Sequence, residues 1–212
     1  MQASAKGSLS PAAGIIPPSC TVDGKPYQQV APSVGFPGYD TTLAKKYFDE
    51  YTQGKEYSFN ILCTEEYETA IRRIIQKWQQ LFGIMLSARV EVAPEDELKA
   101  RVQTGDYQCA FAPVTADAQT AVEFLFSFRD ATNICRYNSE NFNKLLAQLL
   151  TAGSIKSVAE GCTAAQDYLI QNAVIIPMFF HNKYIATNPK ITSVNILRSG
   201  NIISFSETEL LK

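Results

Sequence analysis

The chain has 212 residues, of which 46% are hydrophobic and 19% charged, and its formal net charge is -2. This is ordinary globular composition, and the length is sufficient for one hydrophobic core with additional segments at the ends. A near-neutral charge with scattered Lys and Arg argues against a dedicated nucleic-acid-binding protein. No apolar run approaches the roughly 18 residues that cross a bilayer, so the sequence predicts no transmembrane helix.

The cysteines do not form a metal-binding pattern. There are five of them, an odd number, and no two are spaced as a CxxC pair. A tetrahedral metal site draws its ligands from such close pairs, so we predict neither a metal nor another cofactor. Cys63 and Cys109 fall in predicted strands and Cys162 on the apolar side of a predicted helix. We interpret the cysteines as small buried hydrophobic residues.

Residues 1–39 are rich in Pro, Gly and Ser and lack helical or strand periodicity. Each proline removes a backbone donor and fixes φ, which excludes a run of helix or central strand. We expect an extended arm packed on the surface of the domain, the alternative for the first ten residues being disorder. The side chains that can be buried there are Ile15, Ile16, Val30, Val34 and Phe36.

Residues 40–198 predict an α/β domain that begins with a helix over residues 41–53, capped by Asp40 and ended by Gly54. Strand, helix, strand, helix and strand then alternate. Their predicted bounds are 57–63, 65–82, 84–92, 94–105 and 106–112. Thr64 can cap the first long helix, and glycines follow both helices at the position that favours a left-handed residue. Two strand-helix-strand units in series imply parallel pairing, with ligand-facing loops at the carboxyl ends of the strands.

The rest of the chain predicts more helices and then strands. A short helix over 121–128 would turn Val122, Leu125 and Phe126 inward. Longer helices begin at Asn138 or Ser139 and at Ser154, and Gly161 lies inside the second of them. The nearly continuous apolar run over 174–180 predicts a strand covered on both faces, at a sheet edge or with a bulge because of Pro177. Residues 183–187 and 191–197 predict further strands or extended segments, and residues 199–212 predict a strand-like tail.

Asp117 is the strongest candidate for a ligand-binding side chain. It lies just past the carboxyl end of the third predicted strand, where open α/β sheets bind ligands, and its small neighbours allow a ligand to approach closely. From the residues alone, a second interpretation is equally good: Asp117 could cap the helix over 121–128.

An enzyme is the alternative function class. His181 is the single histidine of the chain, and an open α/β enzyme could combine it with Asp106 or Asp117. A nucleophile elbow, a reactive-cysteine motif and a glycine-rich phosphate loop are all missing from the sequence. A stand-alone binding module is a third possibility.

Several short motifs occur in an order that is similar to one known family. They are Phe82-Gly83-Ile84, the run from Leu98 to Gly105-Asp106-Tyr107, Ala116-Asp117 followed by Phe124-Leu125, Tyr137 with Phe142, and Ile175-Ile176-Pro177-Met178-Phe179. In this order and spacing, over about residues 40–194, the chain resembles the carboxyl-terminal lobe of the extracellular solute-binding proteins that serve peptide and nickel ABC importers (family 5).

The resemblance implies a mixed, mainly parallel sheet with helices on both faces, the periplasmic-binding-protein-like type II lobe. It implies a non-enzymatic role: capture of a peptide or similar small solute between two lobes, with the amino-terminal lobe and an ABC permease as partners. It also implies an exported protein, extracellular or periplasmic and lipid-anchored. We therefore expect the chain to begin inside a longer protein, and its tail over 199–212 to return to the other lobe.

The resemblance also assigns the site. At the position of Asp117 the family provides a carboxylate for the peptide's ammonium group, and Ala116, Thr115 and Val114 would line the same loop. The sequence departs from the family pattern here, because Ala118 stands where an aromatic residue is usual and Pro113-Val114 replaces Gly-Trp. These departures affect the identity of the ligand.

Overall fold

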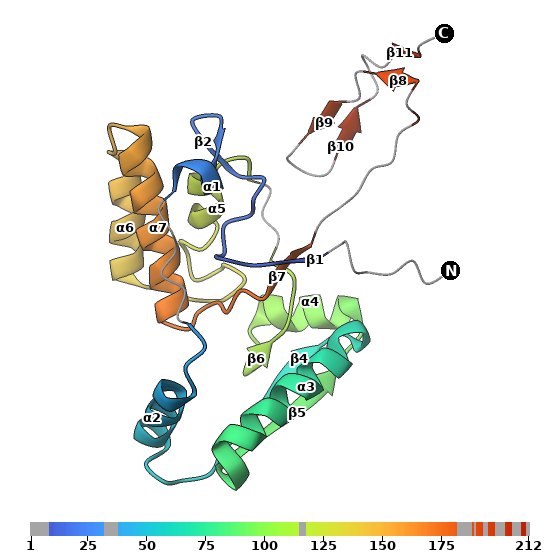
Figure 1. Cartoon of the computed structure of the whole chain (residues 1–212), viewed down its shortest axis with the longest axis vertical. Coiled ribbons are helices and arrows are strands. Elements are labelled where there is room, and N and C mark those ends of the chain that lie inside the picture. The colour runs from blue at the N-terminus through green and yellow to red at the C-terminus, as the bar shows by residue number, and fades with distance from the viewer. Residues whose placement is uncertain are drawn as a thin grey trace. The chain divides into compact units, whose positions relative to one another are not determined.

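The computed structural model describes residues 9–31, 38–114, 118–181, 188, 190–192, 195–197, 202–204 and 209–210. It divides into two compact units (Figure 1). The sheet unit comprises Pro37–Thr115 and Ile134–Arg136, and the helical unit comprises Met1–Phe36, Ala116–Asn133 and Tyr137–Lys212.

A parallel three-stranded sheet forms the centre of the sheet unit. Its strands are β4 (Tyr57–Cys63), β5 (Leu86–Val92) and β6 (Cys109–Ala110), in the order β5-β4-β6. β4 and β5 pair along their whole length, whereas β6 pairs with β4 at only two positions. The predicted parallel α/β arrangement is confirmed.

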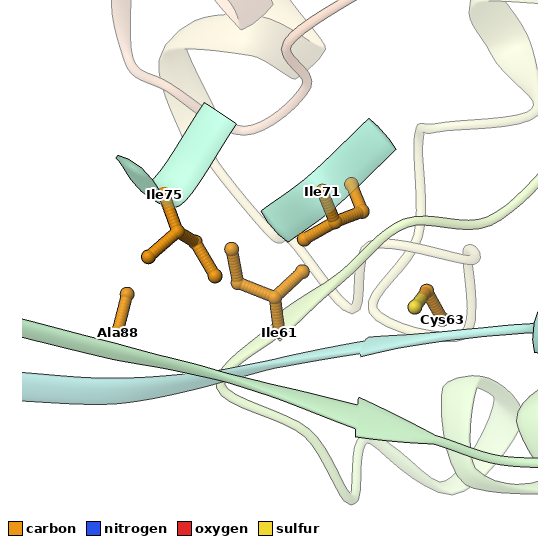
Figure 2. Packing of buried hydrophobic residues seen from close by; sticks show 5 residues of the cluster. All are labelled: Ile61, Cys63, Ile71, Ile75 and Ala88. Atoms are coloured by element: carbon orange, nitrogen blue, oxygen red, sulfur yellow. The ribbon is translucent and has the colours of Figure 1, made fainter. Parts of the chain in front are cut away.

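Helices cover both faces of this sheet. Ile61 and Cys63 of β4 pack against the inner side of α3 (Glu65–Phe82), and Figure 2 shows them facing the isoleucines of that helix. Leu62 points to the opposite face, because side chains alternate along a strand. There it packs with α4 (Glu95–Thr104). The two core clusters are Ile61, Cys63, Ile71, Ile75 and Ala88 on one face and Leu62, Ala93, Leu98 and Val102 on the other.

Several helix ends in the sheet unit agree with the sequence, although Gln53, rather than Gly54, is the left-handed C-cap of α2 (Thr41–Thr52). Asp40 caps α2 by accepting a hydrogen bond from the Leu43 N–H at 2.9 Å, and Gly105 ends α4 in the left-handed conformation. The Thr64 side chain makes no capping hydrogen bond, so that expectation was wrong. The second strand begins later than predicted, since η2 (Gly83–Met85) continues α3 as a 3-10 turn before the backbone extends.

The helical unit packs α5 (Ala121–Phe126), α6 (Glu140–Leu150) and α7 (Ile155–Gln171) around a second core. Ser139 and Ser154 cap α6 and α7 as predicted. The predicted inward face of α5 was partly wrong. Its buried residues are Ala121, Phe124 and Leu125, and Phe128 just beyond the helix is also buried.

Gly161 of α7 packs directly against Leu149 of α6. A Cβ atom placed on Gly161 would lie 2.6 Å from Cδ2 of Leu149, a distance that carbon atoms do not tolerate without movement. A glycine inside a helix costs about 1 kcal/mol relative to alanine. Here the small residue allows the two helices to approach each other.

The described part of the predicted arm contains β1 (Leu9–Pro11), β2 (Thr21–Val22), β3 (Lys25–Pro26) and the short α1 (Tyr27–Val30). Ile15 and Ile16 are buried, as expected, and Val30 is half-buried, whereas Val34 and Phe36 lie outside the described residues. Three buried hydrogen bonds connect this segment to α7. The Ile15 N–H donates to Oε1 of Gln166 at 3.2 Å, Nε2 of Gln166 donates to the Tyr27 hydroxyl at 2.7 Å, and that hydroxyl lies 2.9 Å from Oγ1 of Thr163. The domain bounds 1–39, 40–198 and 199–212 stay predictions.

The apolar run over 174–180 is not a strand covered on both faces. Ile176 and Met178 are 64% and 45% exposed, and the strand β7 comprises only Phe179–His181, paired antiparallel with β1. Pro177 has no N–H to donate, which explains why pairing starts after it.

Farther along the chain, two pairs of short strands are antiparallel. β8 (Ile191–Thr192) pairs with β11 (Glu209–Leu210), and β9 (Asn195–Leu197) pairs with β10 (Ile202–Ser204). The predicted extended segment at 183–187 lies outside the described residues.

Candidate ligand-binding edge of the sheet

The carboxyl ends of the three strands form one continuous backbone edge in the sheet unit. Beyond β6, the Phe111 N–H donates to the Leu62 carbonyl at 2.7 Å. Beyond β5, the Ala93 N–H donates to the Cys63 carbonyl at 3.0 Å. The hydrogen bonds therefore continue past the ends of the paired strands. The Phe111 hydrogen bond holds the segment that leads toward Val114 in place.

An aromatic pair lies at this edge. The rings of Tyr67, in the first turn of α3, and Phe111 have their centroids 4.9 Å apart, and both residues are half-buried. Burial, and then the Glu66 carboxylate, raise the pKa of the Tyr67 hydroxyl, which therefore stays neutral. The edge thus has an apolar surface on which part of a ligand could pack.

Carboxylates adjoin the aromatic pair. Glu65 and Glu66 are exposed in the first turn of α3, where the positive end of the helix dipole stabilises acidic groups. Glu68 is engaged by Arg72, whose Nε donates to it at 2.8 Å. The two exposed carboxylates give the edge a negative charge, which attracts cationic groups and suits no anionic ligand.

The four residues predicted to bind the ligand are only partly within the described chain. Val114 is half-buried at the end of the stretch 38–114, on the segment that leaves the sheet edge. Thr115, Ala116 and Asp117 lie outside the described residues. Their role in binding stays a prediction.

The alternative interpretation of Asp117, a cap for α5, is wrong because Thr120 occupies that position. The Glu123 N–H donates to Oγ1 of Thr120 at 3.1 Å, and Oε2 of Glu123 accepts from the N–H groups of Thr120 and Gln119 at 3.0 and 2.9 Å. These backbone hydrogen bonds hold the pKa of the Glu123 carboxyl below its usual range. The signal was present in the sequence as Thr120-Ala-Val-Glu123, a capping box.

The residues of the enzyme alternative are found in different surroundings. Asp106 belongs to the sheet unit, and its Oδ2 lies 3.3 Å from Nε of Arg101. His181 belongs to the helical unit and is exposed at the end of β7. The Asp106 carboxylate is engaged by Arg101 in this ion pair, which limits its use as a general base.

Sequence reasoning missed the charge network around Arg101. Its Nη1 lies 2.6 Å from Oε1 of Glu91 on β5, and its Nε donates to the backbone oxygen of Asp106 at 3.1 Å. The guanidinium lowers the pKa of the Glu91 carboxyl through this hydrogen bond. These residues line a depression of about 340 Å³ with Asn60, Tyr107 and Gln108. Because the charges are paired with one another, we interpret the network as a link between α4 and the sheet.

The described residues contain neither a group of metal ligands nor a membrane-spanning helix. Among them, no three His, Cys, Asp or Glu side chains are grouped as metal ligands would be. None of the helices in this part of the chain combines the length and the apolar character needed to cross a membrane. The cysteines there are free. Cys20, Cys63 and Cys162 are buried as predicted, whereas Cys109 and Cys135 are only half-buried.

No protein-family model and no curated protein sequence matches the chain. Solved structures are similar to it. Listeria monocytogenes OppA bound to peptide matches 98% of the chain with a TM-score of 0.69 at 18% identity. The periplasmic murein tripeptide binding protein MppA, in its unliganded open form, matches 87% with a TM-score of 0.65 at 19% identity. A peptide-binding protein of a peptide ABC transporter matches 82% with a TM-score of 0.61 at 21% identity.

The chain has the fold of these peptide-binding proteins. The resemblance predicted from the sequence is thereby confirmed at the level of the fold. The chain spans 41% of the OppA chain, 36% of MppA and 80% of the ABC transporter's binding protein. All three of these solved structures are described as binding proteins.

Proposed function

We propose that the chain is the second lobe of a peptide-type solute-binding protein, which captures oligopeptides for an ABC importer. The observation that carries this proposal is the shared fold: 98% of the chain matches a peptide-bound OppA. The negative, partly aromatic edge of the sheet supports it, because a peptide offers both an ammonium group and apolar side chains.

Capture requires a second lobe. One wall cannot remove the ligand from water, and binding proteins of this kind close two domains around the solute. The amino-terminal lobe of the same protein would supply the other wall, and an ABC permease would receive the solute. The protein would then work outside the cytoplasmic membrane or in the periplasm, held by a lipid anchor.

Asp117 is the proposed anchor for the ammonium group of the peptide, with Val114, Thr115 and Ala116 as the neighbouring residues of the loop. The support is its place in the chain, between the end of the sheet edge at Val114 and the capping box at Thr120. Thr120 caps α5, so the cap interpretation of Asp117 does not compete with this proposal. The enzyme alternative has no comparable support, since the Asp106 carboxylate is paired with Arg101.

Calorimetry with the chain alone and with the two-lobed protein tests this proposal. The chain alone should bind free oligopeptides no more tightly than about millimolar, near 4 kcal/mol of binding free energy. The two-lobed protein should bind the same peptides at least a hundredfold more tightly. Micromolar binding by the chain alone would show that one lobe is sufficient. No binding by the two-lobed protein would remove peptides as the solute.

A further inference from the structure

Helix α2 carries a row of exposed aromatic and apolar side chains. Tyr39, Leu43, Tyr47 and Tyr51 follow one another every four residues, and they are 95%, 41%, 61% and 71% exposed. Residues four apart lie on the same side of a helix, so Leu43, Tyr47 and Tyr51 form one strip, and Tyr39 precedes it in the chain, just before the Asp40 cap. We name this strip the tyrosine row.

The opposite side of α2 fixes the direction in which the row points. Phe48 packs on Phe82 of α3, with the ring centroids 4.4 Å apart, and Thr52 is buried. At its carboxyl end the row continues onto the sheet, because the Tyr51 ring meets the Tyr57 ring of β4 edge-on at 5.4 Å. Packing within the sheet unit thus holds the row away from the core. Tyrosine is also the residue type in which protein interfaces are enriched.

One positive and one negative side chain lie beside the tyrosine row, so this surface can complement a second copy of itself. Lys46 and Glu50 are three and seven positions from Leu43, which places them on the same side of the helix. They form an ion pair of 3.8 Å within α2, with side chains that are 64% and 59% exposed. A second pair, Lys45 and Asp49, also at 3.8 Å, is two and six positions from Leu43 and therefore faces away from the row.

We propose that the tyrosine row is the docking surface for a second copy of this chain, with the two α2 helices antiparallel. A two-fold interface places the same patch on both partners, so the patch must complement itself. In an antiparallel pair, Lys46 of each copy comes opposite Glu50 of the other, while tyrosine rings meet between them. Since a single helix face is smaller than a standard interface, the dissociation constant should be on the order of 100 µM.

Charge exchange at the row tests the proposal. Sedimentation velocity of the 212-residue chain from about 10 to 500 µM should show a reversible dimer. Lys46→Glu and Glu50→Lys should each weaken it roughly tenfold, because both symmetric contacts become repulsive. Mixing these two variants should restore the dimer, since every Glu then faces a Lys. The double variant should restore it as well.

The second ion pair provides the matched control. Lys45→Glu disturbs α2 in the same way within the chain, but on the side away from the row, so dimerisation should not change. A monomer at every concentration would overturn the proposal. Equal effects of Lys45→Glu and Lys46→Glu, or no recovery on mixing, would also overturn it, because the self-complementary contact would then not exist. Far-ultraviolet circular dichroism of each variant verifies that α2 stays folded.

Discussion

Replacement of Gln166 by leucine should remove the buried hydrogen bonds that this side chain makes between α7 and the amino-terminal segment. Gln166 is fully buried, and its amide joins the Ile15 N–H and the Tyr27 hydroxyl across more than 130 residues of sequence. Leucine has nearly the same size but no polar atoms. It leaves the Ile15 N–H buried without a partner, which costs about 1–3 kcal/mol, whereas Tyr27 keeps its contact with Thr163. We expect a loss of about 2 kcal/mol in the free energy of unfolding.

Urea unfolding of four proteins measures this loss. They are the unmodified chain, Gln166→Leu, Tyr27→Phe and the double variant. Because the two side chains share a hydrogen bond, the double variant should lose less than the sum of the single losses by about 0.5 kcal/mol or more. Gln171→Leu, at the exposed end of the same helix, is the control and should stay within about 0.5 kcal/mol of the unmodified chain. A similarly small effect of Gln166→Leu would refute the reasoning.

Three further predictions concern stability. Gly161→Ala should destabilise the chain by about 1–3 kcal/mol despite its better helix propensity, and the same change in a Leu149→Ala background should stabilise it, as measured by chemical unfolding. Burial raises the pKa of Cys162 from 9.0 to about 12 and that of Tyr27 from 10.0 to about 12. The unfolded chain therefore ionises first, so the free energy of unfolding should fall as the pH rises from 9 to 12, less steeply in Cys162→Ala. Deletion of residues 200–212 should leave the Tm nearly unchanged, and a drop of about ten degrees or more would contradict a tail that belongs to another lobe.

The sequence predicted the alternating elements of the sheet unit because each had a local signal. Apolar residues repeat every three and four positions in α3, and Gly105 ends α4 where a left-handed residue is needed. The strand lengths had no such signal. β6 is only Cys109–Ala110, because pairing depends on the neighbouring strand rather than on the local residues.

Other features depend on contacts between distant parts of the chain. The run over 174–180 is apolar enough for a buried strand, yet Ile176 is exposed because no described element covers it. The role of Gly161 becomes visible only when α6 and α7 are placed side by side. The Arg101 network joins β5, α4 and the loop at Asp106, and nothing in their local sequence indicates that they meet.

In the candidate site, too, some features could be predicted from local sequence and others could not. The position of Val114 at the carboxyl edge of the sheet follows from the strand order, which the sequence predicted. The capping box at Thr120 and Glu123 could have been found from its spacing. It would have removed the cap interpretation of Asp117 without a structure.

Peptide binding by the two-lobed protein, with and without a free ammonium group, tests the central claim most directly. In the proposed function, closure of the two lobes would shield the Asp117 carboxylate, and loss of one partner from a shielded pair costs about 3–5 kcal/mol. Asp117→Asn should therefore weaken binding of a free-amine peptide roughly a hundredfold or more in calorimetry, and acetylation of the peptide should do the same. The two changes together should add little, because both abolish one contact. Equal affinity of the unmodified protein for acetylated and free peptides would contradict the account.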